Sequence, residues 1–267
     1  MKKNIFSQIG RYLNLEWLFL KMNIIATSKY GISYFLSILY ELMNGLMNIL
    51  YFYIMFGSIS MIGAWKREDI FLLVIIGYFI DVVCVMLFIG SSSIPEYIST
   101  GTLDVLLTKP INHQFLLCFR RPNSVQIINV LLALLLMTKL VFEKEPNFIS
   151  VVLFGVSIIL SVVLMYLVVS TFVYFSFWTV KVGNAWELIE KFNSVSNKPG
   201  IIYPKIFRFF LVFIIPSIVI INFPVEVLTF HNYSLLITRT IPITIVFFII
   251  NKLVFKFGLR HYSGAGG

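Results

Sequence analysis

The sequence predicts an all-α integral membrane protein with six transmembrane helices. Of its 267 residues, 59% are hydrophobic and only 12% are charged, and the mean hydropathy is +0.92. Soluble domains have about twice that share of charged residues. The sequence also contains several nearly uncharged runs of about 20 residues, the length that a helix needs to cross the hydrocarbon core of a bilayer. No stretch has the composition of a soluble domain, so residues 1–267 are predicted to form one transmembrane domain.

Residues 1–28 are predicted to form a cytoplasmic helix that lies on the membrane surface. Within residues 3–22, apolar side chains recur on one helical face and basic or polar side chains on the other, interrupted by Leu18. The apolar face comprises Ile5, Phe6, Ile9, Tyr12, Leu13, Trp17 and Leu20, and the opposite face comprises Lys3, Ser7, Arg11, Asn14 and Lys21. An irregular tail is the alternative. The segment lacks the cleavage pattern of a signal peptide.

Six spans are predicted after this helix. The first two contain one acidic residue each, Glu41 and Asp81, and the third lies between Arg121 and Lys139. The fourth falls inside a charge-free run, and two more apolar runs follow. The predicted spans are residues 30–56, 70–90, 123–142, 149–177, 206–224 and 235–255. Because Pro216 removes a backbone hydrogen bond within the fifth span, we expect a kink there.

The distribution of basic residues predicts the orientation. With the N-terminus inside, 16 of the 21 Lys and Arg residues fall in inner segments and five fall outside. An even number of spans then places both termini in the cytoplasm. The same bias accounts for the net charge of +9, so nucleic acid is not expected as a partner. We therefore expect a multi-pass protein of the cell membrane, with the lipid bilayer as its solvent.

No sequence pattern predicts catalysis. The chain has no GxxxxGK[ST], HExxH or GxSxG motif, and His113, His231 and His261 fall in three different loops. Cys84 and Cys118 have no CxxC or metal-binding spacing and are expected to be small buried hydrophobes. A chain that is not an enzyme is the expectation. A membrane enzyme acting on lipid-linked substrates, or a scaffold or immunity protein, remains as an alternative.

The loop between the second and third spans, residues 91–122, has the strongest functional pattern. Pro95 suits the first turn of a helix, Gly101 permits a sharp bend, and Pro110 ends the next segment. Between them an apolar face is formed by Leu103, Leu106 and Leu107, flanked by Asp104 and Lys109. Such a face either docks into a groove of a partner or packs against the protein's own helix ends. The spacing leaves both readings open.

The run of Ile98, Gly101, Leu103, Leu106, Leu107 and Pro110 resembles the cytoplasmic loop of ABC-2 type permeases, the transmembrane subunits of ABC transporters. Further segments, taken from the N-terminal to the C-terminal side, resemble the same family. They are Phe177-Trp178-Thr179 after the fourth span, Pro199, Tyr203, Pro204 and Arg208 before the fifth, Pro216 and Pro224 within and after it, and the ending 257–266. Residues 223–235 look like the family's small re-entrant helices. Few fixed motifs occur in the loop 179–205.

The resemblance implies a permease subunit that pairs with a second copy or a paralogue and binds separate ABC ATPase subunits. Those subunits would bind ATP and Mg²⁺, and this chain would bind no cofactor. Coupling would run through residues 94–110, specifically Pro95, Ile98, Gly101, Leu103, Asp104, Leu106, Leu107 and Pro110. Because the family consists mostly of exporters of lipids, polysaccharides, peptides, antibiotics and other drugs, we expect export of a hydrophobic, amphiphilic or cationic compound.

Two acidic residues lie inside predicted spans: Glu41 about three turns into the first span, and Asp81 near the middle of the second. A charge at the bilayer centre costs about 2.5–3.5 kcal/mol on insertion scales, so each must face a cavity or a partner, or be protonated. One interpretation is that both line a translocation path for a cationic or amphiphilic substrate. The other is that neighbours such as Tyr40, Asn44 or Tyr78 neutralise them and that they serve packing.

Overall fold

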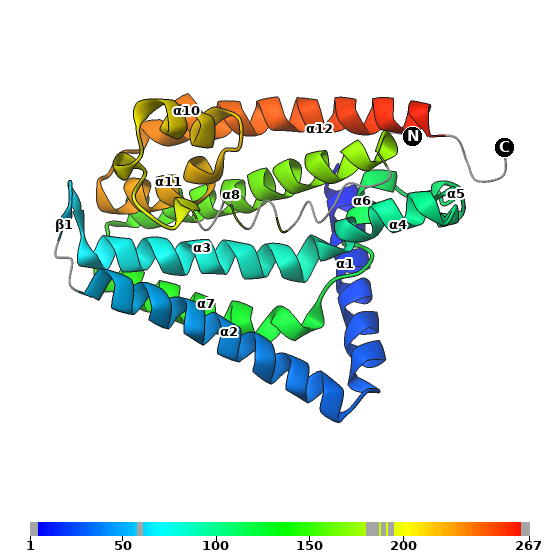
Figure 1. The fold of residues 1–267 in the computed structure, drawn as a ribbon, viewed down its shortest axis with the longest axis horizontal. Helices are drawn as coiled ribbons and strands as arrows, with labels where there is room; N and C mark the ends of the chain where they lie inside the picture. The colour runs from blue at the N-terminus through cyan, green and yellow to red at the C-terminus, as the bar shows by residue number, and fades with distance from the viewer. Residues whose placement is uncertain (1–4, 58–60, 180–186, 188–190, 192–194, 263–267) are drawn as a thin grey trace.

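The protein is described by a computed structural model over residues 5–57, 61–179, 187, 191 and 195–262. Long helices lie side by side in a bundle, and helix α1 (Ile5–Ser28) lies across one end of it (Figure 1). The opposite end has a short antiparallel hairpin of β1 (Met61–Ile62) and β2 (Trp65–Lys66). We call these the loop end, which contains residues 89–123, and the hairpin end, which contains residues 61–66. The predicted all-α integral membrane fold is confirmed.

Five helical stretches are long and apolar enough to cross a membrane: Ile32–Gly57, Arg67–Ser99, Ser124–Phe142, Phe148–Phe177 and Leu236–His261. Their main helices are α2 (Ile32–Gly57), α3 (Arg67–Phe88), α7 (Ile127–Phe142), α8 (Phe148–Tyr174) and α12 (Ile241–His261). Helix α12 continues to His261, beyond the predicted end of the sixth span at residue 255. The other limits lie within a few residues of the predicted ones. Uninterrupted apolar runs of this length leave a helix as the only way to satisfy the backbone in lipid.

The predicted fifth span, residues 206–224, is not one helix. It is divided into α10 (Lys205–Phe213) and α11 (Ser217–Thr229), which meet at an angle of 94°. The break ends at Pro216, which has no N–H to donate to a preceding carbonyl. The sequence correctly predicted an interruption at this proline, but the change of direction is much larger than a kink.

Both outer ends of this bent pair lie at the hairpin end. Before α10, a Cβ added to Gly63 would lie 3.3 Å from Cδ1 of Ile201. After α11, the rings of Phe230 and Trp65 are 5.3 Å apart. The pair therefore begins and ends at the same end of the bundle and is re-entrant. This corrects the prediction that re-entrant helices occupy residues 223–235, because residues 223–229 complete α11.

The residues just before the re-entrant pair already lie at the hairpin end, whereas the residues just after α8 lie at the loop end. Trp178 stacks on His261 at the loop end with ring centroids 6.2 Å apart, whereas Ile201 lies at the hairpin end. The chain therefore lies at the hairpin end before α10 begins. Lys198, Lys205 and Arg208 consequently leave the inner set of basic residues, and Lys191 lies between the two ends, which changes sixteen against five to twelve against eight. This balance still favours cytoplasmic termini.

Helix α1 rests on the loop end through aromatic and polar contacts. The ring of Tyr12 lies edge-on to that of Phe115 at 4.7 Å, and Oδ1 of Asn23 accepts the N–H of Ser124 at 3.0 Å. Leu13 and Trp17, predicted to share a face with Tyr12, are instead 66% and 63% exposed. The side chains of Ile5, Phe6 and Ile9 lie outside the described part of the chain. An apolar face that remains uncovered suits a helix lying on a membrane surface.

Candidate functional site

The loop between α3 and α7 folds into three short helices, α4 (Ile94–Ser99), α5 (Thr102–Leu107) and α6 (His113–Phe119). Pro95 occupies the first turn of α4, where its missing N–H costs no hydrogen bond. Gly101 joins α4 to α5 in the left-handed region, with φ 70° and ψ 0°. Oδ1 of Asn112 accepts the N–H of Phe115 at 3.0 Å and caps α6. Pro95 and Gly101 thus shape the loop as their residue types indicate.

The predicted leucine face of this loop points into the protein. Leu103 and Leu106 are buried, and Leu107 is half-buried. Packing against the protein's own helix ends, one of the two readings that the spacing left open, therefore describes these leucines. The exposed residues of α4, of α5 and of the positions just after each helix form what we call the loop surface: Glu96, Ser99, Thr100, Thr102, Asp104, Val105, Thr108 and Lys109. Pro110 is exposed beside it and Ile98 is half-buried. Val105, which is 64% exposed, is its apolar member.

Two contacts join α4 and α5 to segments next to the long helices. The guanidinium of Arg121 lies 5.2 Å from the ring centre of Tyr97, a buried residue of α4. Just after α12, Tyr262 lies near Asp104. The pKa of the Tyr262 hydroxyl is raised, mainly by burial and also by the neighbouring Asp104 carboxylate. These contacts link α4 and α5 to the segment before α7 and to the end of α12.

A buried polar network connects α6 to the bundle. Nε2 of Gln114 donates to Oδ1 of Asn251 on α12 at 3.0 Å. Nδ2 of Asn251 donates to Oγ of Ser170 at 2.8 Å and to Oγ1 of Thr171 at 3.0 Å, both on α8. Because buried polar groups are costly when unpaired, such a network holds the three helices in one arrangement.

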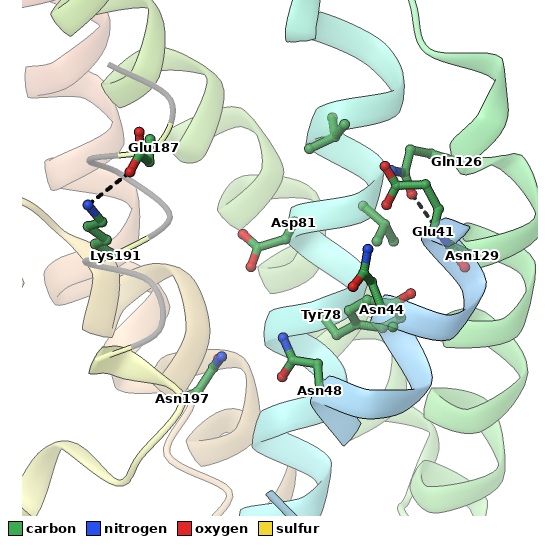
Figure 2. A pocket seen from close by; sticks show the side chains of 13 residues that line it. Glu41, Asn44, Asn48, Tyr78, Asp81, Gln126, Asn129, Glu187, Lys191 and Asn197 are labelled. Atoms are coloured by element: carbon green, nitrogen blue, oxygen red, sulfur yellow. Dashed lines mark hydrogen bonds and ion pairs between the residues drawn. The ribbon is translucent and has the colours of Figure 1, made fainter. Parts of the chain in front are cut away.

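A polar cavity of about 430 Å³ lies between α2, α3, the start of α7 and the segment that ends at Asn197 (Figure 2). It contains both acidic residues predicted for the translocation path, Glu41 and Asp81. Figure 2 shows Asp81 on one side of the cavity facing Glu187 and Lys191 on the other, and these two residues pair with each other at 2.9 Å. The lining therefore has three carboxyl groups and one lysine. The cavity provides a polar environment for groups that are costly to bury in lipid.

Amide side chains form much of the remaining wall: Asn44, Asn48, Gln126, Asn129 and Asn197. Nδ2 of Asn129 donates to Oε1 of Gln126 at 2.9 Å. Among the described residues, three buried lining atoms have no hydrogen-bond partner, namely Oδ1 of Asn129, Oδ1 of Asn197 and the hydroxyl of Tyr78. Buried polar atoms are normally paired, so these three are available to a ligand or to water.

Glycines allow the polar side chains to reach the cavity. The Tyr78 hydroxyl lies directly against Gly45, and Oδ1 of Asn197 lies directly against Gly77. A Cβ at either glycine would overlap these atoms. Gly45 and Gly77 therefore set how closely α2, α3 and the segment before Gly200 approach each other.

Most of this wall was not predicted from the sequence, although a signal was present. Glu41, Asn44 and Asn48 are spaced three and four residues apart and so share one helical face. Tyr78 and Asp81 are three residues apart on α3 and share a face in the same way. Two polar stripes in neighbouring spans indicate a common cavity. Tyr40, considered as a neutralising neighbour, is 67% exposed, whereas Tyr78 lies within electrostatic range of Glu41.

Other residues singled out from the sequence are dispersed. Nδ1 of His231 lies 3.2 Å from Oγ of Ser150 at the hairpin end, whereas His261 stacks on Trp178 at the loop end. Cys84 and Cys118 are buried and free. Within the described residues, no group of three or more His, Cys, Asp or Glu side chains is placed to hold a metal ion.

One family of known proteins matches this chain. The family model described as "ABC-2 family transporter protein" matches residues 42–266, which include α2 from its third turn onward, the loop surface, the re-entrant pair and the wall of the polar cavity except Glu41. No curated protein and no solved structure matches the chain.

Proposed function

This chain belongs to the ABC-2 family of transporter proteins and is a permease subunit of an ABC transporter; on that premise we propose that it exports a cationic or polar amphiphile through the cavity between α2, α3 and α7. ATP and Mg²⁺ would be bound by ATPase subunits supplied by other chains. The protein would work in the cell membrane with both termini in the cytoplasm and with a second permease copy or paralogue beside it.

The polar cavity is the observation that carries this proposal. It lies among helices of membrane-spanning length, and its wall has three carboxyl groups against one lysine. A positively charged or hydrogen-bonding head group would replace water there and pair with Glu41, Asp81 and the unpaired amide oxygens. An apolar tail would extend toward lipid, because the outer faces of α2 and α7 are exposed and apolar.

The loop surface is the proposed contact for the ATPase. It lies at the loop end, on the side to which the basic residues assign the cytoplasm. Its exposed members are mostly polar, with Val105 as an apolar centre, a composition that suits a reversible protein contact. Motion imposed there would reach α8 and α12 through the polar network of Gln114 and Asn251.

The variants Asp81→Asn and Glu41→Gln test this proposal in cells that produce the chain together with its ATPase. Efflux of ethidium, a permanent cation with an aromatic body, would be compared with that of a neutral aromatic dye. Each amide variant should lower ethidium efflux on the order of tenfold, because one lost charge pair of about 1.4 kcal/mol changes affinity by that factor. Glu143→Gln serves as the control, since Glu143 is an exposed carboxylate that pairs with the exposed Lys139.

The amount of chain in the membrane must stay unchanged for the comparison to count. A selective loss of ethidium efflux in both cavity variants, with normal efflux in Glu143→Gln, supports the proposed path. Equal efflux in the native chain and in both cavity variants would contradict it.

A further inference from the structure

A second cavity, at the hairpin end, is lined mainly by basic and aromatic residues. It has a volume of about 270 Å³ and lies between α10 and the π-helical turn Leu236–Thr240 that precedes α12. The residues that line it are Lys205, Arg208, Phe209, Val212, Phe213 and Arg239. Half of the lining residues are therefore cations, although they come from segments more than 25 residues apart in the sequence.

These cations are only partly compensated. Glu226 on α11 lies within electrostatic range of both Arg208 and Arg239. In the part of the chain that the structure describes, neither arginine nor Lys205 forms an ion pair within 4.0 Å. Three positive charges thus meet one negative charge around an open cavity. Like charges held together in this way repel one another unless an anion lies between them.

The apolar wall of the cavity continues onto a face that is exposed on the bundle. On α10, Ile206 is 87% exposed, Phe209 is 59% exposed and Phe213 is 48% exposed. Lys205 and Arg208 turn toward the cavity, so α10 has a basic face and an apolar face. A short amphipathic helix of this kind lies at the boundary between lipid tails and headgroups. The guanidinium of Arg239 lies 6.0 Å from the ring centre of Phe223.

We propose that this cavity binds the phosphate group of an anionic membrane lipid. Guanidinium groups bind phosphate oxygens through paired hydrogen bonds, and lysine adds a point charge, so Arg208, Arg239 and Lys205 match this ligand. Phe209, Val212 and Phe213 would contact the first carbons of the lipid tails. An inorganic phosphate ion shares the headgroup chemistry but would leave these apolar side chains without a partner.

This lipid site is independent of the transport proposal. It lies at the hairpin end and shares no residue with the polar cavity of Glu41 and Asp81. A lipid held there would stabilise the re-entrant pair, because it would neutralise the repulsion between α10 and the start of α12. Its test therefore measures binding and stability rather than efflux.

The test uses the full chain purified in detergent. Phosphatidylglycerol, phosphatidylcholine or sodium phosphate is added in increasing amounts, and native mass spectrometry and thermal unfolding report binding. The double variant Arg208→Gln with Arg239→Gln removes two cavity charges. The matched control, Lys256→Gln with Arg260→Gln, removes two exposed charges near the other end of α12.

Phosphatidylglycerol should bind the native chain and the control alike and should raise their unfolding temperature. Its affinity for the cavity variant should fall by on the order of tenfold or more, because the variant removes two of the three positive charges that attract the anionic lipid. Weak responses to phosphatidylcholine and to sodium phosphate would assign the ligand to an anionic lipid.

A response to sodium phosphate as large as that to the lipid, lost in the same variant, would support the phosphate chemistry and assign it to a soluble source. Equal phosphatidylglycerol affinity in the native chain and the cavity variant would overturn the proposal. If the double variant does not fold, the single variant Lys205→Gln at the exposed start of α10 decides: unchanged affinity would overturn the proposal as well.

Discussion

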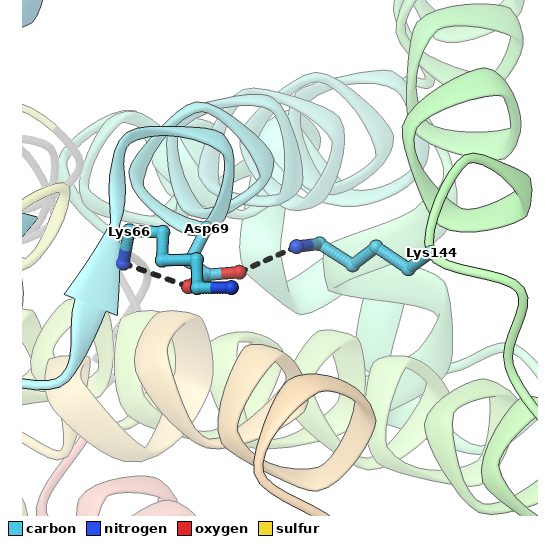
Figure 3. Close-up of polar contacts among 3 residues, drawn as sticks. All are labelled: Lys66, Asp69 and Lys144. Carbon is cyan, nitrogen blue, oxygen red and sulfur yellow. Dashed lines mark hydrogen bonds and ion pairs between the residues drawn. The ribbon is translucent and has the colours of Figure 1, made fainter. Parts of the chain in front are cut away.

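Asp69 and Lys144 form a largely buried ion pair at the hairpin end (Figure 3). Asp69 is 1% exposed and lies in the first turn of α3, whereas Lys144 lies between α7 and α8. The second carboxylate oxygen of Asp69 accepts the backbone N–H of Lys66 at 2.8 Å and so also caps α3. One side chain thereby fixes the hairpin, the start of α3 and the connection between α7 and α8.

Asp69→Ala is expected to destabilise the protein by about 3 kcal/mol or more, because it leaves the partly buried ammonium of Lys144 unpaired and removes a helix cap. Thermal unfolding in detergent measures the loss. Combining Asp69→Asn with Lys144→Gln should cost less than the sum of the two single changes, since the double variant leaves no unpaired charge. Strict additivity would show that the pair contributes nothing.

Gly77→Ala is expected to push the Asn197 amide out of the polar cavity, because the new methyl group would occupy the place of Oδ1. Overpacking of this kind costs about 1–3 kcal/mol. Gly155→Ala on α8 is the matched control, since no atom lies within 4 Å of its added Cβ. The unfolding temperature and the ethidium efflux should both fall in Gly77→Ala and should stay at the native values in Gly155→Ala. A neutral Gly77→Ala variant would show that the two segments are not in contact.

Gly101→Ala is expected to strain the turn between α4 and α5. At φ 70° a Cβ costs about 1–2 kcal/mol, which glycine avoids. If the loop surface is the ATPase contact, the variant should also lower transport-linked ATP hydrolysis. Gly10→Ala on α1 serves as the control, because this glycine is helical and its Cβ would meet nothing within 4 Å. Unaltered stability in Gly101→Ala would contradict the left-handed turn.

Val105→Asp is expected to separate coupling from folding. Val105 is 64% exposed, so the charge should leave the free energy of unfolding within about 0.5 kcal/mol of the native value, as is usual at surfaces. Co-purification of the ATPase and its stimulated ATP hydrolysis should nevertheless be lost. Val105→Thr, which keeps the shape without a charge, should retain both activities. Normal ATPase capture by Val105→Asp would remove this surface from the contact.

Glu16 on α1 should make stability depend on pH. Burial raises the pKa of Glu16 to about 8 from 4.5, and among the described residues neither carboxylate oxygen has a hydrogen-bond partner. Between these two pKa values the folded state holds a proton that the unfolded state has released. Stability should therefore decline as pH rises through this window and level off above the folded-state pKa.

Unfolding temperatures measured from about pH 5 to about pH 9 test this dependence. Glu16→Gln should flatten the decline, because its side chain does not titrate, and should be the more stable protein at the alkaline end. The pH profile of Gly10→Ala, on the same helix, should match that of the native chain. A Glu16→Gln profile that still declines in parallel with the native one would place the titrating group elsewhere.

The spacing of the loop leucines did not reveal whether they face a partner or the protein's own helices. The spacing of Leu103, Leu106 and Leu107 correctly indicated a helical face, but two opposite environments require the same spacing. Burial of Leu103 and Leu106 depends on tertiary packing, in which α4 and α6 both contact α5. A helix of six residues has no pattern of its own that distinguishes a neighbour from a partner.

The sequence by itself determined the class of this protein and the limits of most of its long helices, because transfer of apolar residues into lipid depends on composition and length alone. Tertiary structure alone decided that residues 205–229 turn back at Pro216, since an apolar run is equally suited to a crossing helix and to a re-entrant one. It also decided that Glu41, Asp81 and Asn197 share one cavity. Such convergence depends on how helices distant in sequence pack, with Gly45 and Gly77 allowing the close approach.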